Sequence, residues 1–275
     1  MTSQTARSPI SSQPPILLRE QAGDVAILTL NRPDARNSLS EGLIAALDAA
    51  LRDIHDDAKV RAVVVAATGK AFSAGHDMKE LTARRSDADR GRAYFAEIMT
   101  TCSTMMQAIV HLPKPVVAAV QGVATAAGCQ LVASCDLAIA SEATTFATPG
   151  VDIGLFCSTP MVALSRNVAR KQAMEMLLTG EPISATTARD IGLVNRVVPA
   201  GTEREAAIEL AQKVARKSAY TIKIGKAAFY RQAEMSLAEA YRYTAAVMTE
   251  NMMARDVEEG IGAFIEKRKP KWQDK

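Results

Sequence analysis

The chain has 275 residues, of which 48% are hydrophobic and 23% are charged, so one domain with a sizeable buried core is expected. Its 33 lysines and arginines against 30 aspartates and glutamates give a net charge of +3, and these charges are interspersed along the chain. That pattern argues against a nucleic-acid-binding surface, and the chain has no run of about 18 apolar residues that would span a membrane. We therefore expect neither a nucleic-acid partner nor a membrane segment.

The first fifteen residues, 1–15, are rich in serine, threonine, glutamine and proline, and no acidic residue precedes Glu20. This composition predicts a disordered tail on a cytoplasmic protein. The alternative is an organellar presequence, which would place the protein in an organellar matrix, although Arg7 alone makes a poor cationic face.

Short runs rich in valine, isoleucine and alanine predict buried strands, because a strand that is covered on both faces reads as a continuous apolar run. These runs are Val25–Leu30, Ala62–Ala67, Val116–Val120 and Leu137–Ala140. Helical periodicity lies between them, which indicates an α/β protein.

Helices are expected between and after these strands. Ser38 with Glu41 makes a possible capping box that opens a leucine-rich helix, and a second helix is expected over about 91–111. Further along, the strand pattern fades and helices dominate, with expected starts at Ser184 and Asp256. The cysteines lack CxxC or Cys/His spacing, so we expect reduced core thiols and no metal ion.

Two turns of small residues follow apolar runs. The first lies within Lys70–Glu80, after Ala62–Ala67, and the second is Gly122–Gln130, after Val116–Val120. A turn of this kind at a strand end can aim a backbone N–H into a cleft, where it stabilises negative charge on a carbonyl oxygen. Two such turns are what an oxyanion hole for a thioester needs.

With other segments in the same order, these turns resemble the crotonase superfamily, also called the enoyl-CoA hydratase/isomerase family. The resemblance runs from about Ile16 to Trp272 and includes Leu30–Ser38, Cys135–Ala140, Leu178–Gly180, Gly192–Val194 and Gly260–Arg268. Gly154–Pro160 resembles one poorly defined branch of that family.

The resemblance implies a crotonase-type spiral of repeated ββα units, followed by a C-terminal helical region that mediates trimerisation. It divides the chain into the tail at 1–15, the α/β core at 16–200 and the helical region at 201–275. The expected assembly is a homotrimer or a dimer of trimers.

The resemblance also implies an acyl-CoA substrate and no separate cofactor, because coenzyme A arrives as part of the substrate. It assigns the oxyanion donors to the N–H groups of His76 and Ala127. Ala127 lies where a helix is expected to begin, so its N–H has no partner within the helix and sits at the positive end of the dipole. The His76 imidazole itself is interpreted as a surface or packing group, with a catalytic base as the alternative.

Two departures from the family pattern concern proton transfer. In family hydratases two glutamates activate the water and deliver the proton, and their places fall on Gln130 and Gly150. Glutamine does not exchange a proton near neutral pH and glycine has no side chain. Efficient hydration is therefore not expected. Asp152 is a candidate to take over proton transfer, with a surface carboxylate as the alternative.

The resemblance implies further substrate-binding positions at Ala35, Arg36, Ser38, Ala74, Asp77, Met78, Leu155 and Ser158. The backbone around Ala74 and His76 would hold the adenine, and the first three positions would line the path of the pantetheine and phosphates. Lys267 of a neighbouring subunit is placed like the family's phosphate contact, with a solvated helix end as the alternative.

Three functions remain open at this point. The first is a lyase or isomerase that acts on an acyl-CoA through a thioester enolate. The second is a decarboxylase of a malonyl-type acyl-CoA, since loss of CO₂ leaves an enolate without the help of a base. The third is a catalytically silent acyl-CoA-binding or scaffold protein.

Overall fold

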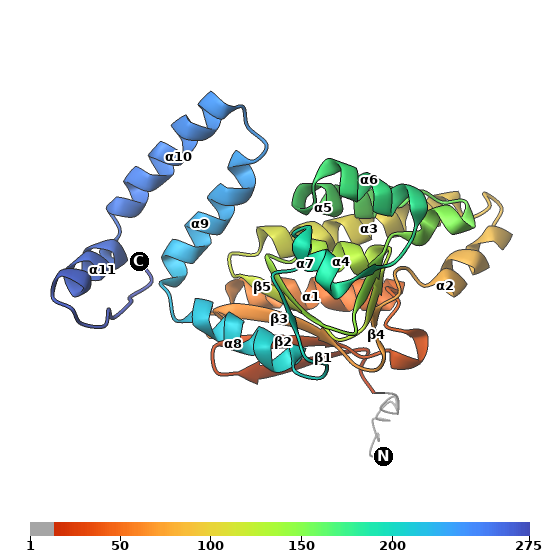
Figure 1. Ribbon diagram of the computed structural model, residues 1–275, viewed down its shortest axis with the longest axis horizontal. Coiled ribbons are helices and arrows are strands. Elements are labelled where there is room, and N and C mark those ends of the chain that lie inside the picture. The colour runs from red at the N-terminus through yellow and green to blue at the C-terminus, as the bar shows by residue number, and fades with distance from the viewer. Residues whose placement is uncertain (1–13) are drawn as a thin grey trace, which may run out of the picture.

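A computed structural model describes residues 14–275 as a spiral of strands and helices that ends in a helical arm (Figure 1). Most of the expected tail at 1–15 lies outside these residues. The larger sheet has the strand order β1-β2-β3-β5-β7-β10, and the smaller sheet has the order β4-β6-β8-β9. The strands are β1 (Leu17–Ala22), β2 (Val25–Leu30), β3 (Ala62–Ala67), β4 (Ala71–Ser73), β5 (Val116–Val120), β6 (Val123–Thr125), β7 (Leu137–Ser141), β8 (Thr145–Ala147), β9 (Ile183–Ser184) and β10 (Arg196–Val198).

Neighbouring strands are parallel except for the pairs β1–β2 and β8–β9. The four expected strands are β2, β3, β5 and β7, of which only β7 differs, by one added residue. Each of β3, β5 and β7 is followed by a short strand of the smaller sheet and then by helices. The α/β class and the repeated ββα unit are confirmed.

Helices cover both faces of the larger sheet. The helices are α1 (Glu41–Asp56), α2 (Met78–Ala83), α3 (Arg92–His111), α4 (Ala127–Ser134), α5 (Ser158–Asn167), α6 (Arg170–Thr179), α7 (Ala185–Asp190), α8 (Glu203–Ala215), α9 (Ala219–Gln232), α10 (Leu237–Met252) and α11 (Arg255–Ile265). Short 3₁₀ turns are η1 (Pro33–Ala35), η2 (Arg84–Ser86) and η3 (Pro149–Ile153). In the described residues, no helix is both long and apolar enough to cross a membrane.

The main hydrophobic core lies between the sheets and helices α1, α3 and α4, and a second cluster lies on the other face of the larger sheet. In that cluster α8 presents Ala207, Ala211 and Ala215 to the strands, which allows close approach of the helix because each side chain is only a methyl group. All four cysteines are free and buried, as expected. Burial raises the pKa of Cys102 and of Cys129 to about 12, so these thiols stay protonated at neutral pH.

Of the helix starts expected from the sequence, the one at Ser184 is confirmed and the one at Ser38 is not. Ser184 caps α7, since its hydroxyl accepts the Thr187 N–H at 3.1 Å. The cap of α1, however, is Ser40 and not Ser38, because Ser40 directly precedes the helix with an extended backbone and accepts the Leu43 N–H at 3.2 Å. The Ser38 and Glu41 capping box is therefore wrong.

Asp256 is also not a helix cap. Helix α11 begins one residue earlier, at Arg255, after Ala254. The Asp256 carboxylate instead accepts the N–H groups of Gln273 at 2.7 Å and Asp274 at 3.0 Å, and the residue is 2% exposed. Its role is to tether the C-terminal tail, which folds back on the arm.

Helices α9, α10 and α11 form an arm that projects away from the spiral (Figure 1). The arm is fixed to the core through Asp136, at the start of β7. Its carboxylate accepts Lys226 at 2.7 Å, Tyr230 at 2.8 Å and the Val116 N–H at 2.7 Å. The Lys226 ammonium also donates to two main-chain carbonyls, and its side chain is 8% exposed. This buried ion pair fixes the base of the arm on the strands.

Replacement of Asp136 by alanine should strongly destabilise the fold. Removing one partner of a buried ion pair leaves the other charge uncompensated, which costs about 3–5 kcal/mol. Urea unfolding of Asp136→Ala measures the loss. Asp190→Ala is the matched control, because Asp190 is 60% exposed in its pair with Arg189 and its removal should change stability by about 0.5 kcal/mol or less. Equal effects in the two variants would contradict the role given to Asp136.

Candidate functional site

The candidate site lies where the short parallel strands β4, β6 and β8 end. Gly75 and His76 follow β4, Ala126 and Ala127 follow β6, and Gly150 follows β8. The carboxyl ends of parallel strands meet at one edge of their sheet, so these residues gather there. The small strands β4 and β6 were not expected, and the turns follow them rather than the longer strands β3 and β5.

The first two turns touch each other through glycines. A Cβ at Gly128 would overlap the Ser73 carbonyl, so the first turn of α4 packs against the end of β4. Gly75 has φ +86°, and a Cβ there would lie 3.0 Å from the Ala126 Cβ and 3.3 Å from the Ala127 nitrogen. This backbone contact is open only to residues without a side chain.

Two backbone N–H groups on these turns have no partner within residues 14–275. The Gly75 carbonyl accepts the Leu39 N–H at 2.7 Å and the Asp77 N–H donates to the Leu39 carbonyl at 3.3 Å, which leaves the intervening His76 N–H free. The Ala127 N–H begins α4 and is likewise unpaired. It lies at the positive end of the helix dipole. The pair assigned from the sequence therefore offers two unpaired donors on contacting turns.

Ala126 holds a backbone conformation that alanine rarely adopts, with φ 50° and ψ −118°. Its N–H donates to the Ala147 carbonyl at 2.9 Å, and its own carbonyl accepts the Gln130 N–H at 3.0 Å. These two hydrogen bonds fix the residue from both sides, which is how strained residues persist at functional sites. The conformation decides where the next N–H, that of Ala127, points.

A further loop lies beside the first turn and contains the expected binding residues Ala35, Arg36 and Ser38. The Ala74 N–H donates to the Arg36 carbonyl at 3.1 Å, and the Ser38 hydroxyl lies 3.2 Å from the Asp77 carboxylate. Arg36 is exposed and Ser38 is buried. These residues are thus brought together with Ala74 and Asp77.

Asp77 joins this loop to α2. Its carboxylate pairs with Arg32 at 3.0 Å and accepts the Lys79 N–H at 3.1 Å as the cap of α2. Burial alone would raise the pKa of Asp77, but these hydrogen bonds and that of Ser38 hold the pKa below its usual value. Arg32 was not expected to have this role, and neither was Asn37, whose buried amide holds the loop by donating to the Thr68 and Ala71 carbonyls at 2.7 and 2.8 Å.

Gln130 is buried and His76 is half-buried, and three of their side-chain atoms are buried without a hydrogen-bond partner in the described residues. Gln130 is 5% exposed, and its Oε1 atom is buried with no partner among the described residues. Both ring nitrogens of His76 are in the same situation. Burial lowers the pKa of His76, although the nearby Leu39 carbonyl opposes this shift, so the imidazole is neutral at pH 7. The expected packing role leaves these nitrogens unexplained.

Gly150, the second position that the resemblance assigns to a glutamate, is enclosed by the chain itself. A Cβ at Gly150 would lie 2.7 Å from the Leu155 carbonyl oxygen and 2.9 Å from the Cys157 sulfur. The Leu155 N–H donates to the Gly150 carbonyl at 2.8 Å, which closes the loop over this position. Gly150 therefore has no room for any side chain, and least of all for a glutamate.

The remaining expected residues lie on the surface. Asp152 is exposed, with its carboxylate next to Gly180 at the end of α6, and no described contact joins it to the free donors. Met78 and Leu155 are 47% and 52% exposed, and Ser158 is exposed at the start of α5. Lys267 follows α11 on the arm, far from α2 within one chain (Figure 1).

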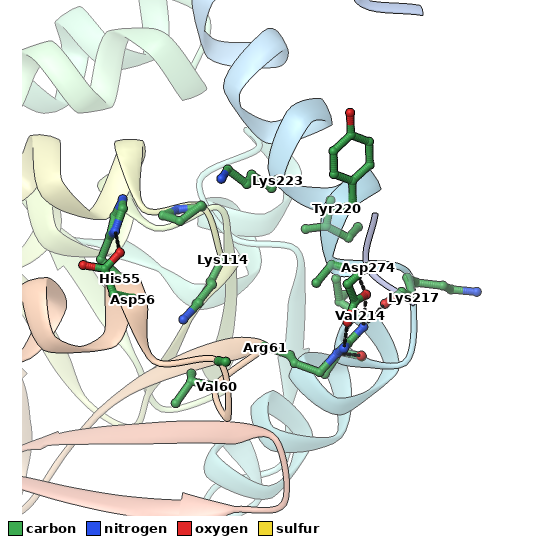
Figure 2. Close-up of a pocket in the computed structure, with 15 residues that line it drawn as sticks. His55, Asp56, Val60, Arg61, Lys114, Val214, Lys217, Tyr220, Lys223 and Asp274 are labelled. Carbon is green, nitrogen blue, oxygen red and sulfur yellow. Dashed lines mark hydrogen bonds and ion pairs between the residues drawn. The ribbon is translucent and has the colours of Figure 1, made fainter. Parts of the chain in front are cut away.

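A cavity of about 250 Å³ lies elsewhere, at the amino ends of β3 and β5 (Figure 2). Two of its cations are engaged: Lys114 donates to the carbonyls of Ile54 and Asp57, and Arg61 pairs with Asp274 at 2.6 Å. The described residues contain no group of three or more histidine, cysteine, aspartate or glutamate residues arranged to hold a metal ion. The unpaired backbone donors of His76 and Ala127 instead follow the ends of β4 and β6.

Comparisons with known proteins show which family and which solved structures the chain is similar to. The sequence pattern of the family described as "Enoyl-CoA hydratase/isomerase" matches residues 20–275. "Enoyl-CoA hydratase domain-containing protein 3, mitochondrial" of Xenopus laevis is 46% identical over 94% of this chain and 86% of its own length.

Two solved structures are also similar. An enoyl-CoA hydratase of Mycobacterium smegmatis has a TM-score of 0.89 at 49% identity, covering 94% of this chain and 99% of that one. Human enoyl coenzyme A hydratase domain-containing protein 3 has a TM-score of 0.89 at 46% identity, covering 94% of this chain and all of that one (100%).

Ala126→Gly should leave the fold as stable or make it more stable. Alanine at φ 50° bears a strain of about 1–3 kcal/mol, which glycine does not. This gain exceeds the about 0.5–1 kcal/mol that glycine costs through the larger backbone entropy that it loses on folding. Thermal unfolding measures the change. Ala133→Gly, within the same helix, is the matched control and should lose about 1 kcal/mol. An equal loss in both variants would show that Ala126 is not strained.

Proposed function

This chain belongs to the enoyl-CoA hydratase/isomerase family, and we propose that it binds an acyl-CoA whose thioester oxygen accepts the N–H groups of His76 and Ala127. The observation that carries this proposal is that both donors are unpaired and lie on turns in contact with each other. Backbone donors fixed in this way stabilise charge that develops on a carbonyl oxygen, and each is typically worth about 3 kcal/mol in the transition state.

The reaction that suits such a site forms a thioester enolate, as in a lyase or isomerase that acts on an acyl-CoA. The negative charge moves from the α-carbon onto the thioester oxygen, where the two N–H groups bind it. Neither Gln130 nor Gly150 supplies an ionisable group for the proton transfers of hydration. The filled space at Gly150 supports a reaction other than efficient hydration.

A second candidate is decarboxylation of a malonyl-type thioester. The electrons of the breaking C–C bond pass to the α-carbon and the thioester oxygen, CO₂ leaves, and a solvent proton later completes the product. This step requires no base, which matches a site with a glutamine and a glycine at the glutamate positions. A silent acyl-CoA-binding or scaffold protein is the remaining alternative.

We infer that coenzyme A lies along the loop of Ala35, Arg36 and Ser38, with its adenine against the backbone of Ala74 and His76. The hydrogen bonds that hold this loop beside the first turn support that path. Lys267 is exposed on the arm, so its contact with a phosphate requires the arm of a neighbouring subunit.

The proposed assembly is a homotrimer or a dimer of trimers. Large apolar side chains on the arm are open to solvent in one chain, including Phe264 at 84%, Met253 at 80% and Leu237 at 76% exposure. Large apolar side chains that are left exposed in this way on one part of a chain indicate an interface. Sedimentation velocity at micromolar protein should therefore show at least a trimer, and a monomer would contradict this assembly.

The word mitochondrial in the name of the Xenopus laevis relative supports the organellar alternative over the expected cytoplasmic location. Residues 1–13, where a presequence would fall, lie outside the described residues.

Acetyl-CoA should bind, and Ala127→Pro should weaken binding about tenfold by removing one hydrogen bond to the carbonyl. Proline suits this first helical position, which favours a folded variant. Arg170→Pro is the control, because it places proline at the first position of α6, outside the site. Calorimetry measures the affinity of the unaltered protein and of the two variants for acetyl-CoA. If the unaltered protein releases no heat of binding at millimolar acetyl-CoA, the proposed function is contradicted.

Crotonyl-CoA hydration should be slow, because each missing carboxylate removes about 10²–10⁴ in rate. Gln130→Glu should not restore efficient hydration, since its partner position at Gly150 is filled by Leu155 and Cys157. Loss of the enoyl thioester absorbance measures the rate. A turnover equal to that of an efficient hydratase assayed alongside would show that another base is present.

A further inference from the structure

The C-terminal strap, residues 271–275, places the Asp274 carboxylate in an anion site at the base of the arm. The two Asp274 oxygens accept the Arg61 guanidinium at 2.6 and 3.0 Å, and one of them also accepts the Ala219 N–H at 2.7 Å. Arginine binds carboxylates and phosphates alike through this paired geometry. Ala219 is the first residue of α9, so its N–H lies at the positive end of the helix dipole.

The main chain holds Arg61 in place independently of Asp274. The Arg61 Nε atom donates to the Ala215 carbonyl at 2.8 Å, and Nη2 donates to the Lys217 carbonyl at 2.7 Å. Burial alone would raise the pKa of Asp274, but the hydrogen bonds from Arg61 and the Ala219 N–H hold the pKa below its usual value. The site therefore favours a negative charge, and its main donor stays fixed when Asp274 leaves.

This anion site opens on the cavity of about 250 Å³ at the amino ends of β3 and β5 (Figure 2). The cavity is smaller than the roughly 300–1,000 Å³ of pockets for drug-sized ligands, which suits a small ion. The charged groups that line it include the cations Arg61, Lys114, Lys217 and Lys223 and the acids Asp56 and Asp274. Without Asp274, the positive charges outnumber the negative ones.

Asp274 leaves part of the binding capacity of the cavity unused. The Tyr220 N–H, at the second position of α9, has no partner within residues 14–275. Lys223 lies one helical turn after Ala219, and its side chain is directed toward the core, whereas Lys217 points away from it (Figure 2). A tetrahedral phosphate has more oxygens than a carboxylate and a greater charge, so it suits these additional donors.

We propose that this cavity binds inorganic phosphate on Arg61 and the start of α9, and that Asp274 occupies the same position as an internal competitor. Entry of phosphate displaces the carboxylate from both of its partners. The strap is then held by its other contacts. This site lies at the amino ends of β3 and β5, away from the ends of β4, β6 and β8, so the inference does not rest on the proposed function.

Calorimetry of the full chain with inorganic phosphate, at constant ionic strength, tests the site. Asp274→Gly removes the carboxylate, and glycine adopts the φ of 60° found there without strain. This variant should bind phosphate about tenfold or more tightly than the unaltered protein, because a tethered group competes at a millimolar effective concentration. Asp190→Gly is the matched control: it frees Arg189 from an exposed pair outside the cavity and should bind like the unaltered protein.

Two lysine variants in the Asp274→Gly background locate the bound ion. Lys223→Gln should weaken phosphate binding about twofold to fivefold, as expected for an exposed charge contact. Lys217→Gln is its control and should leave the affinity unchanged, because the Lys217 side chain points away from the cavity (Figure 2). Equal effects of the two substitutions would overturn the proposed position.

Trp272, the single tryptophan of the chain, reports on the strap itself. Its Nε1 donates to the Arg216 carbonyl at 2.9 Å, and a Cβ at Gly260 would lie 3.2 Å from its ring. Saturating phosphate should make Trp272 of the unaltered protein easier to quench with acrylamide, whereas sodium chloride of equal ionic strength should not. Unchanged quenching in saturating phosphate would overturn the competition by Asp274.

The binding results decide the rest of the proposal. Failure of Asp274→Gly to bind phosphate would overturn the anion site, as would an affinity equal to that of the unaltered protein. Acetate, which has only two oxygens, should bind Asp274→Gly more weakly than phosphate does. Equal binding of acetate would overturn phosphate as the ligand.

Discussion

The contact between two backbone turns, one after β4 and one after β6, is the constraint on which the site depends. Because Gly128 has no side chain, the start of α4 can pack against the end of β4. Because Gly75 has none, the turn after β4 comes so close to Ala127 that a Cβ on Gly75 would lie 3.3 Å from the Ala127 nitrogen. Ala126 is held at a positive φ between hydrogen bonds on both sides. Together these features orient two N–H groups without the use of any side chain.

A site made from backbone can keep its carbonyl-binding function while the side chains around it change. By the family resemblance the two glutamate positions fall on Gln130 and Gly150, and these two residues have different surroundings. The Gln130 side-chain oxygen is buried without a partner in the described residues, whereas Gly150 is enclosed by the Leu155 carbonyl and the Cys157 sulfur. Glutamine does not exchange a proton near neutral pH, and the enclosure of Gly150 leaves no space for the side chain of a general base.

Much of the fold could be predicted from the sequence because the long strands are buried on both faces, so each reads as an uninterrupted apolar run. β2, β3 and β5 match their expected bounds for this reason. The short strands β4 and β6 have three residues each, too few to show a period, yet they carry the turns of the site.

Other features depend on residues far apart in the sequence. Asp256 has the spacing of a helix cap but binds the N–H groups of Gln273 and Asp274, which only the folded tail brings near. In the same way, the positions of the vacated glutamates could be read from the family motif, but the obstruction of Gly150 by Leu155 could not. The oxyanion assignment itself stays a prediction that the geometry supports.

The infrared spectrum of bound acetyl-CoA labelled with ¹³C at its thioester carbonyl tests the central claim most directly. Two hydrogen bonds from His76 and Ala127 would polarise the carbonyl and weaken its C=O bond. The account predicts that the labelled band moves to lower frequency on binding, and that Ala127→Pro reverses part of this shift. A bound thioester whose carbonyl band stays at its frequency in water would contradict the account.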